Sequence, residues 1–195
     1  LNPARNFTYT YDDSGNMRRA QSSGATYEFT YDEDNRGMAV GHTAGATTTN
    51  IANRYDALGR RIARALNGTE TRYVLDLTGG MERIFADSDA TGTITARYVH
   101  GPDGLGYRED ASGAIVCYHA DALGNIIRLT DGTGATISDY VYSPYGRVLA
   151  ATGTAATPYR FVGSQGVMEE LPELYFMRAR YYSADAGVFL STDPV

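Results

Sequence analysis

Short runs that alternate between apolar and polar side chains recur along this chain, and turn residues separate each run from the next. Residues 7–11, Phe-Thr-Tyr-Thr-Tyr, place an aromatic side chain at every second position. A β-strand points successive side chains to opposite faces, so this pattern is typical of a strand with one buried face. Asp bonds the backbone ahead of it and Gly accepts a positive φ, so the Asp and Gly residues that follow favour a chain reversal. The pattern therefore predicts β-hairpins.

The runs belong to a repeat of roughly 20 residues that begins with a Tyr-Asp pair. The clearest copies begin at Tyr11-Asp12, Tyr31-Asp32 and Tyr55-Asp56, and each continues to a Gly or Asn three residues after the Asp. Later copies keep the tyrosine but lose part of the turn, at Tyr73, Tyr98, Tyr118 and Tyr142. A single hairpin cannot bury its apolar face, so the hairpins are expected to stack into one sheet.

Second turns join the copies, and the clearest is Asn67-Gly68, a strong hairpin signal. The strands expected after these second turns are residues 72–75, 94–99, 115–118 and 137–142. Two stretches rich in Ala, Gly and Thr are expected to form longer loops, residues 41–50 and 150–157. Residues 166–172 are expected to hold one helical turn that ends at the proline.

The fold class that follows is all-β. We expect a curled, continuous antiparallel sheet of stacked hairpins that makes part of a shell, with the C-terminal segment tucked against its inner face. The hairpin repeats occupy residues 1–157 and the terminal segment residues 158–195, within one continuous structural unit. Composition agrees, because 16 Tyr and 22 Gly suit half-exposed sheets with many turns.

Charge and hydropathy exclude some classes of function. The net charge of −6 argues against a nucleic-acid surface, which would be basic. No apolar run is long enough to span a membrane as a helix. The chain begins with Leu1-Asn2-Pro3 and carries no signal peptide, so we expect a fragment whose targeting signal lies upstream.

The usual signals of catalysis and metal binding are weak. His42, His100 and His119 lie on different repeats, without the spacing of metal ligands. Residues 87–92 match the start of a calcium loop, but Tyr98 stands where the loop needs a glutamate, so a hairpin turn is favoured. No phosphate loop, nucleophile elbow or dinucleotide fingerprint is present, and we expect no cofactor and no metal.

The repeated Tyr-Asp pairs allow two interpretations. They are either a ladder of sugar- or ion-binding sites, or turn chemistry combined with tyrosine stacking along the sheet. A repeat that carries structure in every copy favours the second.

The terminal segment carries an ordered set of motifs. It opens with Tyr-Arg-Phe-Val-Gly at 159–163, continues with Leu-Tyr-Phe-Met-Arg-Ala-Arg-Tyr-Tyr at 174–182, and closes with Gly-Val-Phe-Leu-Ser-Thr-Asp-Pro at 187–194. Together with the Tyr-Asp repeat, this set resembles the RHS/YD-repeat proteins and their RHS-repeat-associated core motif, as in Rhs polymorphic toxins and the C subunits of ABC-type toxins. The resemblance implies a hollow shell of hairpins that the core motif closes at one end. Such shells enclose or present a C-terminal effector used in interbacterial competition or host attack.

The resemblance also implies a set of site residues. Members of the family often release the effector by aspartyl autoproteolysis, and by position the carboxylate of the first Asp-Pro is Asp193 and the arginine is Arg160. The acidic residue expected between Gly163 and Leu174 is Glu169 or Glu170, and Glu170 is taken as the candidate. Two close carboxylates that share a proton supply an acid and a base for peptide hydrolysis.

The chain departs from the family pattern at three points. Between Gly163 and Leu174 it has glutamate in a longer segment, where the family usually has Asp in a shorter one. Ser183-Ala184 stands where the family usually has Asp-Pro, and the sequence stops at Val195, before the second Asp-Pro at which the family cuts. Protease activity is therefore not expected of this chain as given. The alternative role of Arg160 and Asp193 is a buried salt bridge that seals the plug.

Three functions stay open from the sequence. A structural shell segment for a C-terminal effector is favoured. The second is a secreted surface adhesin or self-assembling binding module, since tyrosine-rich faces bind glycans and exposed sheet edges polymerise. The third is an aspartyl autoprotease. The expected partners are accordingly the effector, neighbouring repeats, further copies or a glycan, at a secreted or cell-surface location.

Overall fold

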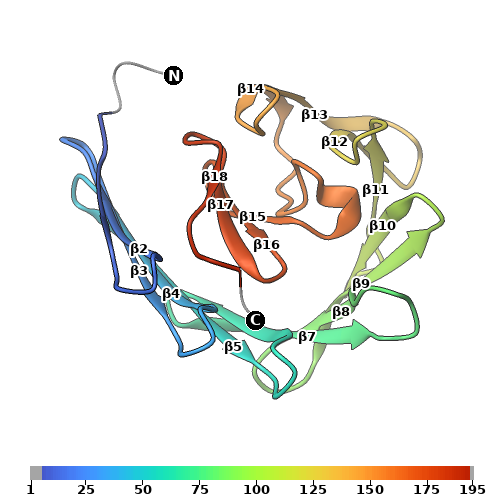
Figure 1. The fold of residues 1–195 in the computed structure, drawn as a ribbon. Coiled ribbons are helices and arrows are strands. Elements are labelled where there is room, and N and C mark those ends of the chain that lie inside the picture. The colour runs from blue at the N-terminus through green and yellow to red at the C-terminus, as the bar shows by residue number, and fades with distance from the viewer. Residues whose placement is uncertain (1–5, 194–195) are drawn as a thin grey trace.

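The computed structural model describes residues 6–193. It contains two antiparallel sheets, and nearly all of its regular structure is β (Figure 1). The larger sheet has 14 strands in chain order, each bonded to its neighbours along the chain, and it curls without closing. The smaller sheet of four strands lies within the curve of the larger one (Figure 1). The predicted all-β, curled sheet of hairpins is confirmed.

The strands of the larger sheet are β1 (Thr8–Tyr11), β2 (Met17–Gln21), β3 (Ala25–Tyr31), β4 (Gly37–Ala44), β5 (Thr47–Tyr55), β6 (Arg61–Leu66), β7 (Thr69–Asp76), β8 (Arg83–Ser88), β9 (Ile94–Gly101), β10 (Gly104–Asp110), β11 (Ile115–Ala120), β12 (Ile126–Asp131), β13 (Thr136–Tyr142) and β14 (Val148–Gly153). We call residues 158–193 the plug. It contains the 3-10 turn η1 (Gly163–Gln165) and the strands β15 (Met168–Leu171), β16 (Leu174–Met177), β17 (Arg180–Ser183) and β18 (Val188–Phe189).

The Asp of each clear repeat closes its turn from within. The Asp12 carboxylate accepts the backbone N–H of Ser14 at 3.0 Å and of Asn16 at 2.9 Å, and Gly15 has φ of 83°. The same pair of bonds, from the second and fourth following residues, recurs at Asp32, Asp56 and Asp121. This repeated turn is local chemistry, which is why the sequence predicts it well.

The tyrosine of the repeat holds neighbouring hairpins together. Register shifts mark the strand ends at Tyr31, Tyr55 and Tyr142. Their hydroxyls donate to the carbonyl oxygen of the first residue of β2, β4 and β12, at 3.1, 2.9 and 2.7 Å respectively. A bulge re-aims a side chain and increases the local twist, so the same residues stitch the sheet and help to curl it.

Three local predictions are wrong. Residues 41–50 form no long loop, because β4 and β5 continue through them and reverse at Gly45-Ala46; Thr-rich runs suit strands. Residues 150–153 complete β14, so only the part after Gly153 is a loop. Residues 166–172 hold no helical turn, since Met168–Leu171 forms β15 and pairs with β16.

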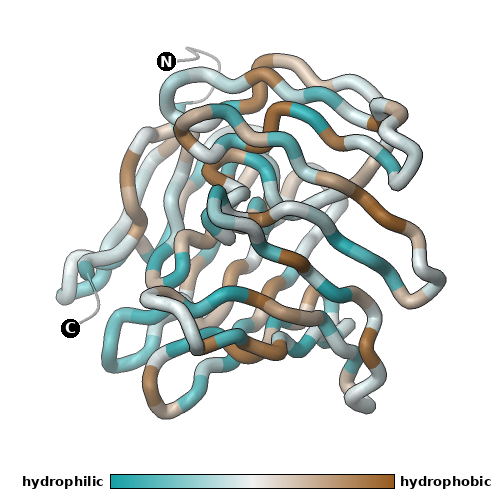
Figure 2. The backbone as a smooth tube through the Cα atoms, turned by 90° about the vertical axis from the view of Figure 1, so that its right-hand side faces the viewer, coloured by the Kyte–Doolittle hydropathy of each residue, from teal (hydrophilic) through white to brown (hydrophobic). Residues whose placement is uncertain are grey.

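The core lies between the inner face of the large sheet and the plug, and apolar residues alternate with polar ones along the strands (Figure 2). One cluster joins β2–β5 to the plug strands and contains Phe29, Val40, Ile51, Phe176 and Tyr181 among others. A second joins β7–β13 to the start of the plug and contains Tyr73, Tyr98, Tyr118, Tyr140 and Tyr159 among others. The plug therefore touches both halves of the sheet.

Candidate functional site

Glu170 is the centre of a buried ion-pair network between the plug and β6. Its side chain is 1% exposed, and its Oε1 accepts Arg61 Nη1 at 2.7 Å. Arg64 Nε contacts the second oxygen, Oε2. Two guanidinium groups therefore face one carboxylate at the interface of plug and sheet, where removing the carboxylate would leave buried charge unpaired.

Arg61 is enclosed on several sides. Its guanidinium carbon lies 3.6 Å from the centroid of the Phe176 ring and 5.3 Å from that of Tyr73. Its Nη1 also donates to Asn53 Oδ1 at 3.2 Å. Contacts with aromatic faces stabilise a cation that has lost its water, so the aromatic residues and Glu170 share the cost of burying Arg61.

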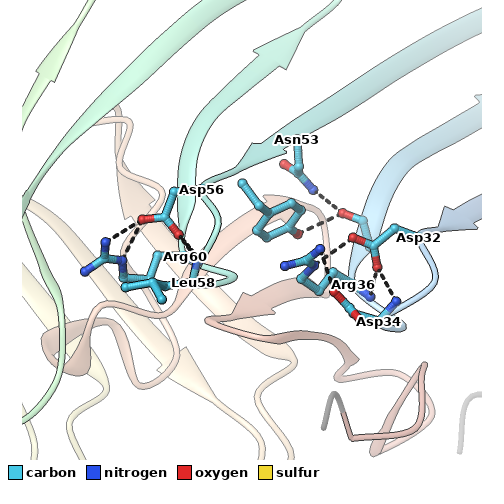
Figure 3. A network of polar contacts seen from close by, with 9 residues as sticks. Asp32, Asp34, Arg36, Asn53, Asp56, Leu58 and Arg60 are labelled. Carbon is cyan, nitrogen blue, oxygen red and sulfur yellow. Dashed lines mark hydrogen bonds and ion pairs between the residues drawn. The ribbon is translucent and has the colours of Figure 1, made fainter.

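Asn53 connects this network to the repeat turns. Its amide donates to the carbonyl of Gly37 and to the Tyr181 hydroxyl, each at 2.8 Å. Figure 3 shows Asn53 beside the turn of Asp32 and Arg36, with the turn of Asp56 and Arg60 next to it. A Cβ at residue 37 would lie 2.8 Å from the Tyr181 ring, so this close approach of plug and sheet requires glycine.

Arg160 and Glu169 form a separate pair on the other side of β15. Arg160 Nη1 lies 2.7 Å from Glu169 Oε2. Burial raises the pKa of Glu169 above its usual value, and the lowering by Arg160 does not offset this effect. The acidic residue that lies beside Arg160 is therefore Glu169, whereas the sequence candidate Glu170 is held by Arg61 and Arg64.

Asp193 lies apart from both pairs. Its side chain is 78% exposed, and its Oδ1 lies 3.5 Å from Arg180 Nε. The expected buried salt bridge between Arg160 and Asp193 is wrong, because each has a different partner and Asp193 faces solvent. Across residues 6–193, no ion pair or hydrogen bond joins any two of the three candidates Asp193, Glu170 and Arg160.

Two buried asparagines of the repeat turns, Asn16 and Asn125, clamp the plug, and neither role was predicted from the sequence. Asn16 Oδ1 accepts the backbone N–H of Thr192 at 3.1 Å and its hydroxyl at 3.2 Å. Asn125 Oδ1 accepts the N–H of Val162 at 3.0 Å. Both asparagines use the amide nitrogen to bind the Asp of their own turn.

The signal for these clamps is the fifth residue of the Asp-x-x-Gly-x turn. Where that residue is arginine, as at Arg60, its guanidinium turns back to the Asp of the same turn. Asparagine is shorter and also carries an acceptor, so it satisfies the Asp and keeps one oxygen for the plug.

Two of the histidines and the calcium-like loop have structural partners. His42 stacks on Tyr27 with ring centroids 4.3 Å apart, and His119 Nε2 lies 3.0 Å from the Thr130 hydroxyl. Asp89 accepts bonds from Thr91 and Thr93 of its own hairpin turn. Within residues 6–193 no three His, Cys, Asp or Glu side chains gather as a metal site, and no helix is long and apolar enough to cross a membrane.

Comparisons with known proteins agree with the fold. No family model matches the chain. The tRNA nuclease WapA of Bacillus subtilis (strain 168) is 32% identical over 188 residues, which cover 95% of this chain and 8% of WapA. The double-stranded DNA deaminase toxin A of Burkholderia cenocepacia (strain H111) is 28% identical over 220 residues, 96% of this chain and 15% of the toxin.

The crystal structure of TcdB2-TccC3 aligns with a TM-score of 0.61 and 17% identity, over 96% of this chain and 12% of that one. The likeness shows a shared fold, and this chain spans only a small part of each relative's length. The Tyr-Asp repeat, the terminal motif, the curled meander sheet and these relatives together place the chain in the RHS/YD-repeat family.

Proposed function

We propose that this chain is a structural segment of an RHS shell that encloses or presents a C-terminal effector, and that the parent protein acts outside the cell. The observation that carries the proposal is the attachment of the plug at both of its ends. Asn125 holds Val162 near its start and Asn16 holds Thr192 near its finish, with Glu170 buried between them. A segment that is clamped on the inner face suits a fixed closure better than a mobile arm.

The attachment also gives a following segment a defined departure point. Thr192 is bound to Asn16, and Met17 N–H donates to Leu190 O at 2.7 Å, so the backbone is held directly before Asp193. Any polypeptide that continues from there starts at the sheet and not at a free end.

Limited proteolysis of the full-length protein that contains this chain tests the proposal. We expect the region C-terminal to the plug to resist protease in the native protein and to become sensitive in the double variant Asn16→Ala/Glu170→Ala. Glu28→Ala, which removes an exposed partner of Arg19, is the control. Equal cleavage of that region in the native and unfolded proteins would contradict enclosure.

Assembly through sheet edges is the second candidate. It rests on β1 and β14, which end the large sheet and each pair with one neighbour within the described residues. Unpaired strands accept a further strand, from neighbouring repeats or from another copy. Sedimentation velocity over a range of concentrations separates these outcomes, since only association between copies depends on concentration. An adhesive role additionally requires glycan binding, which a glycan array measures.

Autoproteolysis is the third candidate, and the pairing of Arg160 with a carboxyl of raised pKa is what favours it. The test is the intact mass of the full-length protein. A shortened product that returns to full length in both Asp193→Asn and Glu169→Gln, but not in Glu170→Gln, would assign Glu169 to the reaction. An uncut native product would remove the candidate.

A further inference from the structure

A pocket lies between strands β7–β9 and the plug, away from the Arg160–Glu169 pair. It has a cavity volume of about 60 Å³, which is room for a small ion, and it is partly open to solvent. The buried residues Arg61, Tyr73 and Tyr159 line it, and so do Arg83, His100 and Arg178. Neither the shell proposal nor the clamps give this pocket a role.

Arg61 carries a donor without an adequate partner there. Its side chain is 4% exposed, and Nη1 is bound to Glu170 and Asn53. The only hydrogen-bond acceptor of Nη2 within the described residues is Met168 Sδ at 3.0 Å. A thioether is a weak acceptor, so the inner arginine retains hydrogen-bonding capacity on the side of the pocket.

The two buried tyrosines of the pocket also carry donors that have no protein partner among the described residues. Tyr73 is 7% and Tyr159 3% exposed, and neither hydroxyl is hydrogen-bonded to another residue in 6–193. The other tyrosines of the same core do have partners: Tyr98 with Asp87, Tyr118 with Thr157 and Tyr140 with the Ala155 carbonyl. Neither oxygen is among the fully enclosed side-chain atoms that lack a partner, so both hydroxyls are donors that a molecule in the pocket can reach.

All of these inner groups act as donors at neutral pH. Burial raises the pKa of Tyr73 to about 12 and raises that of Tyr159 well above its usual value, so both phenols keep their protons. Burial also lowers the pKa of His100, which keeps that ring neutral at the pocket. A cation or an apolar molecule would leave the donors unsatisfied, whereas an oxygen acceptor would satisfy them.

The charge of the lining favours an acceptor that is negative. Arg61, Arg83 and Arg178 line the pocket, with Glu82 as the single acidic lining residue. Glu82 lies 3.9 Å from Arg178 and Glu170 pairs with Arg61. The excess positive charge of the lining is therefore that of Arg83, which has no ion pair within residues 6–193. Arg178 is held in place at φ of 61° by donating to the carbonyls of Glu82 and Gln165, each at 2.6 Å. A water molecule would accept the same hydrogen bonds but would not balance the excess positive charge.

We propose that this pocket binds a small oxyanion, either a free anion such as phosphate or a carboxylate carried by a polypeptide. The anion accepts hydrogen bonds from Arg61 and from the hydroxyls of Tyr73 and Tyr159, while Arg83 and Arg178 supply charge. The site is independent of whether the shell encloses an effector.

Calorimetric titration of the 195-residue chain tests this, with sodium phosphate, sodium acetate and a capped Gly-Glu-Gly peptide as probes. Sodium chloride keeps the ionic strength constant, so that general screening is excluded. Tyr73→Phe and Tyr159→Phe remove one donor each and keep the ring, with Tyr107→Phe as the control outside the pocket. Arg83→Gln removes charge, with Arg97→Gln as its control.

We expect saturable binding that weakens about tenfold in each phenylalanine variant, because each loses a hydrogen bond to a charged group, and that is unchanged in both controls. Binding of phosphate in preference to acetate and peptide identifies a free anion; the reverse order identifies a polypeptide carboxylate. A shift of the Arg61 Nε–Hε resonance on addition of the anion gives a readout that needs no variant.

Two results would overturn the proposal. One is the absence of saturable binding for all three probes together with an unshifted Arg61 resonance. The other is binding that is equal in the native chain, the pocket variants and the controls, which would place the anion elsewhere.

Discussion

The two halves of the large sheet hold the plug by different chemistry. Against β1–β6 the plug packs apolar side chains and buries one carboxylate, Glu170, between Arg61 and Arg64. Against β7–β14 it inserts Tyr159 among other tyrosines, and the Tyr175 hydroxyl donates to the Gly146 carbonyl at 2.8 Å. The ion pairs of this half, Arg147 with Glu173 and Arg178 with Glu82, are more exposed than the pair of Arg61 with Glu170. The same repeat supports both interfaces, because its turns fix the backbone and leave the inward side chains free to vary.

The difference has consequences for stability. Removing one member of a buried carboxylate–arginine network should cause a large loss of stability, because the remaining charged groups are left buried without a partner or water. Removing one ring from a cluster of tyrosines should cause a smaller loss of stability, since each ring contributes only its own buried area and edge contacts. Substitutions in the two halves should therefore differ in size and in pH dependence.

The largest effect is expected from Glu170→Ala in the first half. It leaves Arg61 and Arg64 unpaired and should lower the free energy of unfolding by about 3–5 kcal/mol. Urea unfolding followed by circular dichroism measures this. Glu28→Ala is the control, since its ion pair with Arg19 is 3.7 Å long and exposed, and it should cost less than about 1 kcal/mol. Equal losses for the two variants would mean that the buried network contributes nothing special.

Tyr159→Leu in the second half should cost less, about 1–3 kcal/mol. The variant loses the edge contacts of the ring with Tyr98 and Tyr118, whose centroids lie 5.4 and 6.1 Å away, but keeps an apolar side chain. The same urea experiment applies. Tyr11→Leu is the matched control, because Tyr11 is a repeat tyrosine that is 57% exposed on β1. A loss as large as that of Glu170→Ala would erase the contrast between the halves.

The two asparagine clamps compare the halves directly. Asn16→Ala and Asn125→Ala should each cost about 1–2 kcal/mol, with the larger loss at Asn16, which accepts two bonds from Thr192. Hydrogen exchange should speed up at the Thr192 amide in the first variant and at the Val162 amide in the second. In Arg60→Ala, where the native side chain binds only within its own turn, neither amide should change.

The smallest effect is a dependence on pH. Burial raises the pKa of Asp87 despite the hydrogen bond from Tyr98. The Asp87 carboxyl therefore binds its proton more tightly in the native state than in the unfolded state. As the pH falls from above the native pKa to below the unfolded pKa, protonation of Asp87 stabilises the native state increasingly. Asp87→Asn should thus be more stable than the native chain at neutral pH, and the gain should vanish on acidification.

Asp56→Asn supplies the opposite sign. The hydrogen bonds from Arg60 lower the pKa of Asp56, so its stabilising contribution is present at neutral pH and is lost as pH falls. Unfolding measured from neutral pH to about pH 4 should show the two stability differences moving in opposite directions. If both stability differences moved in the same direction with pH, burial would not be what sets the pKa of Asp87.

The sequence predicts the features that depend on neighbouring residues and misses those that depend on distant ones. The turn at Asp12 can be predicted from the sequence because its donors, its acceptor and its glycine lie within five residues. The contact of Arg61 with Glu170 spans 109 residues, and spacing does not reveal it. Consecutive residues of a strand face opposite sides, so choosing between Glu169 and Glu170 requires knowing what lies on each side of β15. The division of the chain after residue 157 stays a prediction.

The chain-ordered pairing of the large sheet also sets an order of folding. Each of its strands needs only its neighbours in sequence, so the sheet can grow hairpin by hairpin from contacts of low sequence separation, which form early. The contacts of the plug join residues as far apart as Asn16 and Thr192, which are 176 positions apart, and they form only after the plug itself has been made. A chain synthesised from its N-terminus would therefore form the large curved sheet first and dock the plug last. Docking of the plug would then require that the large sheet is already complete.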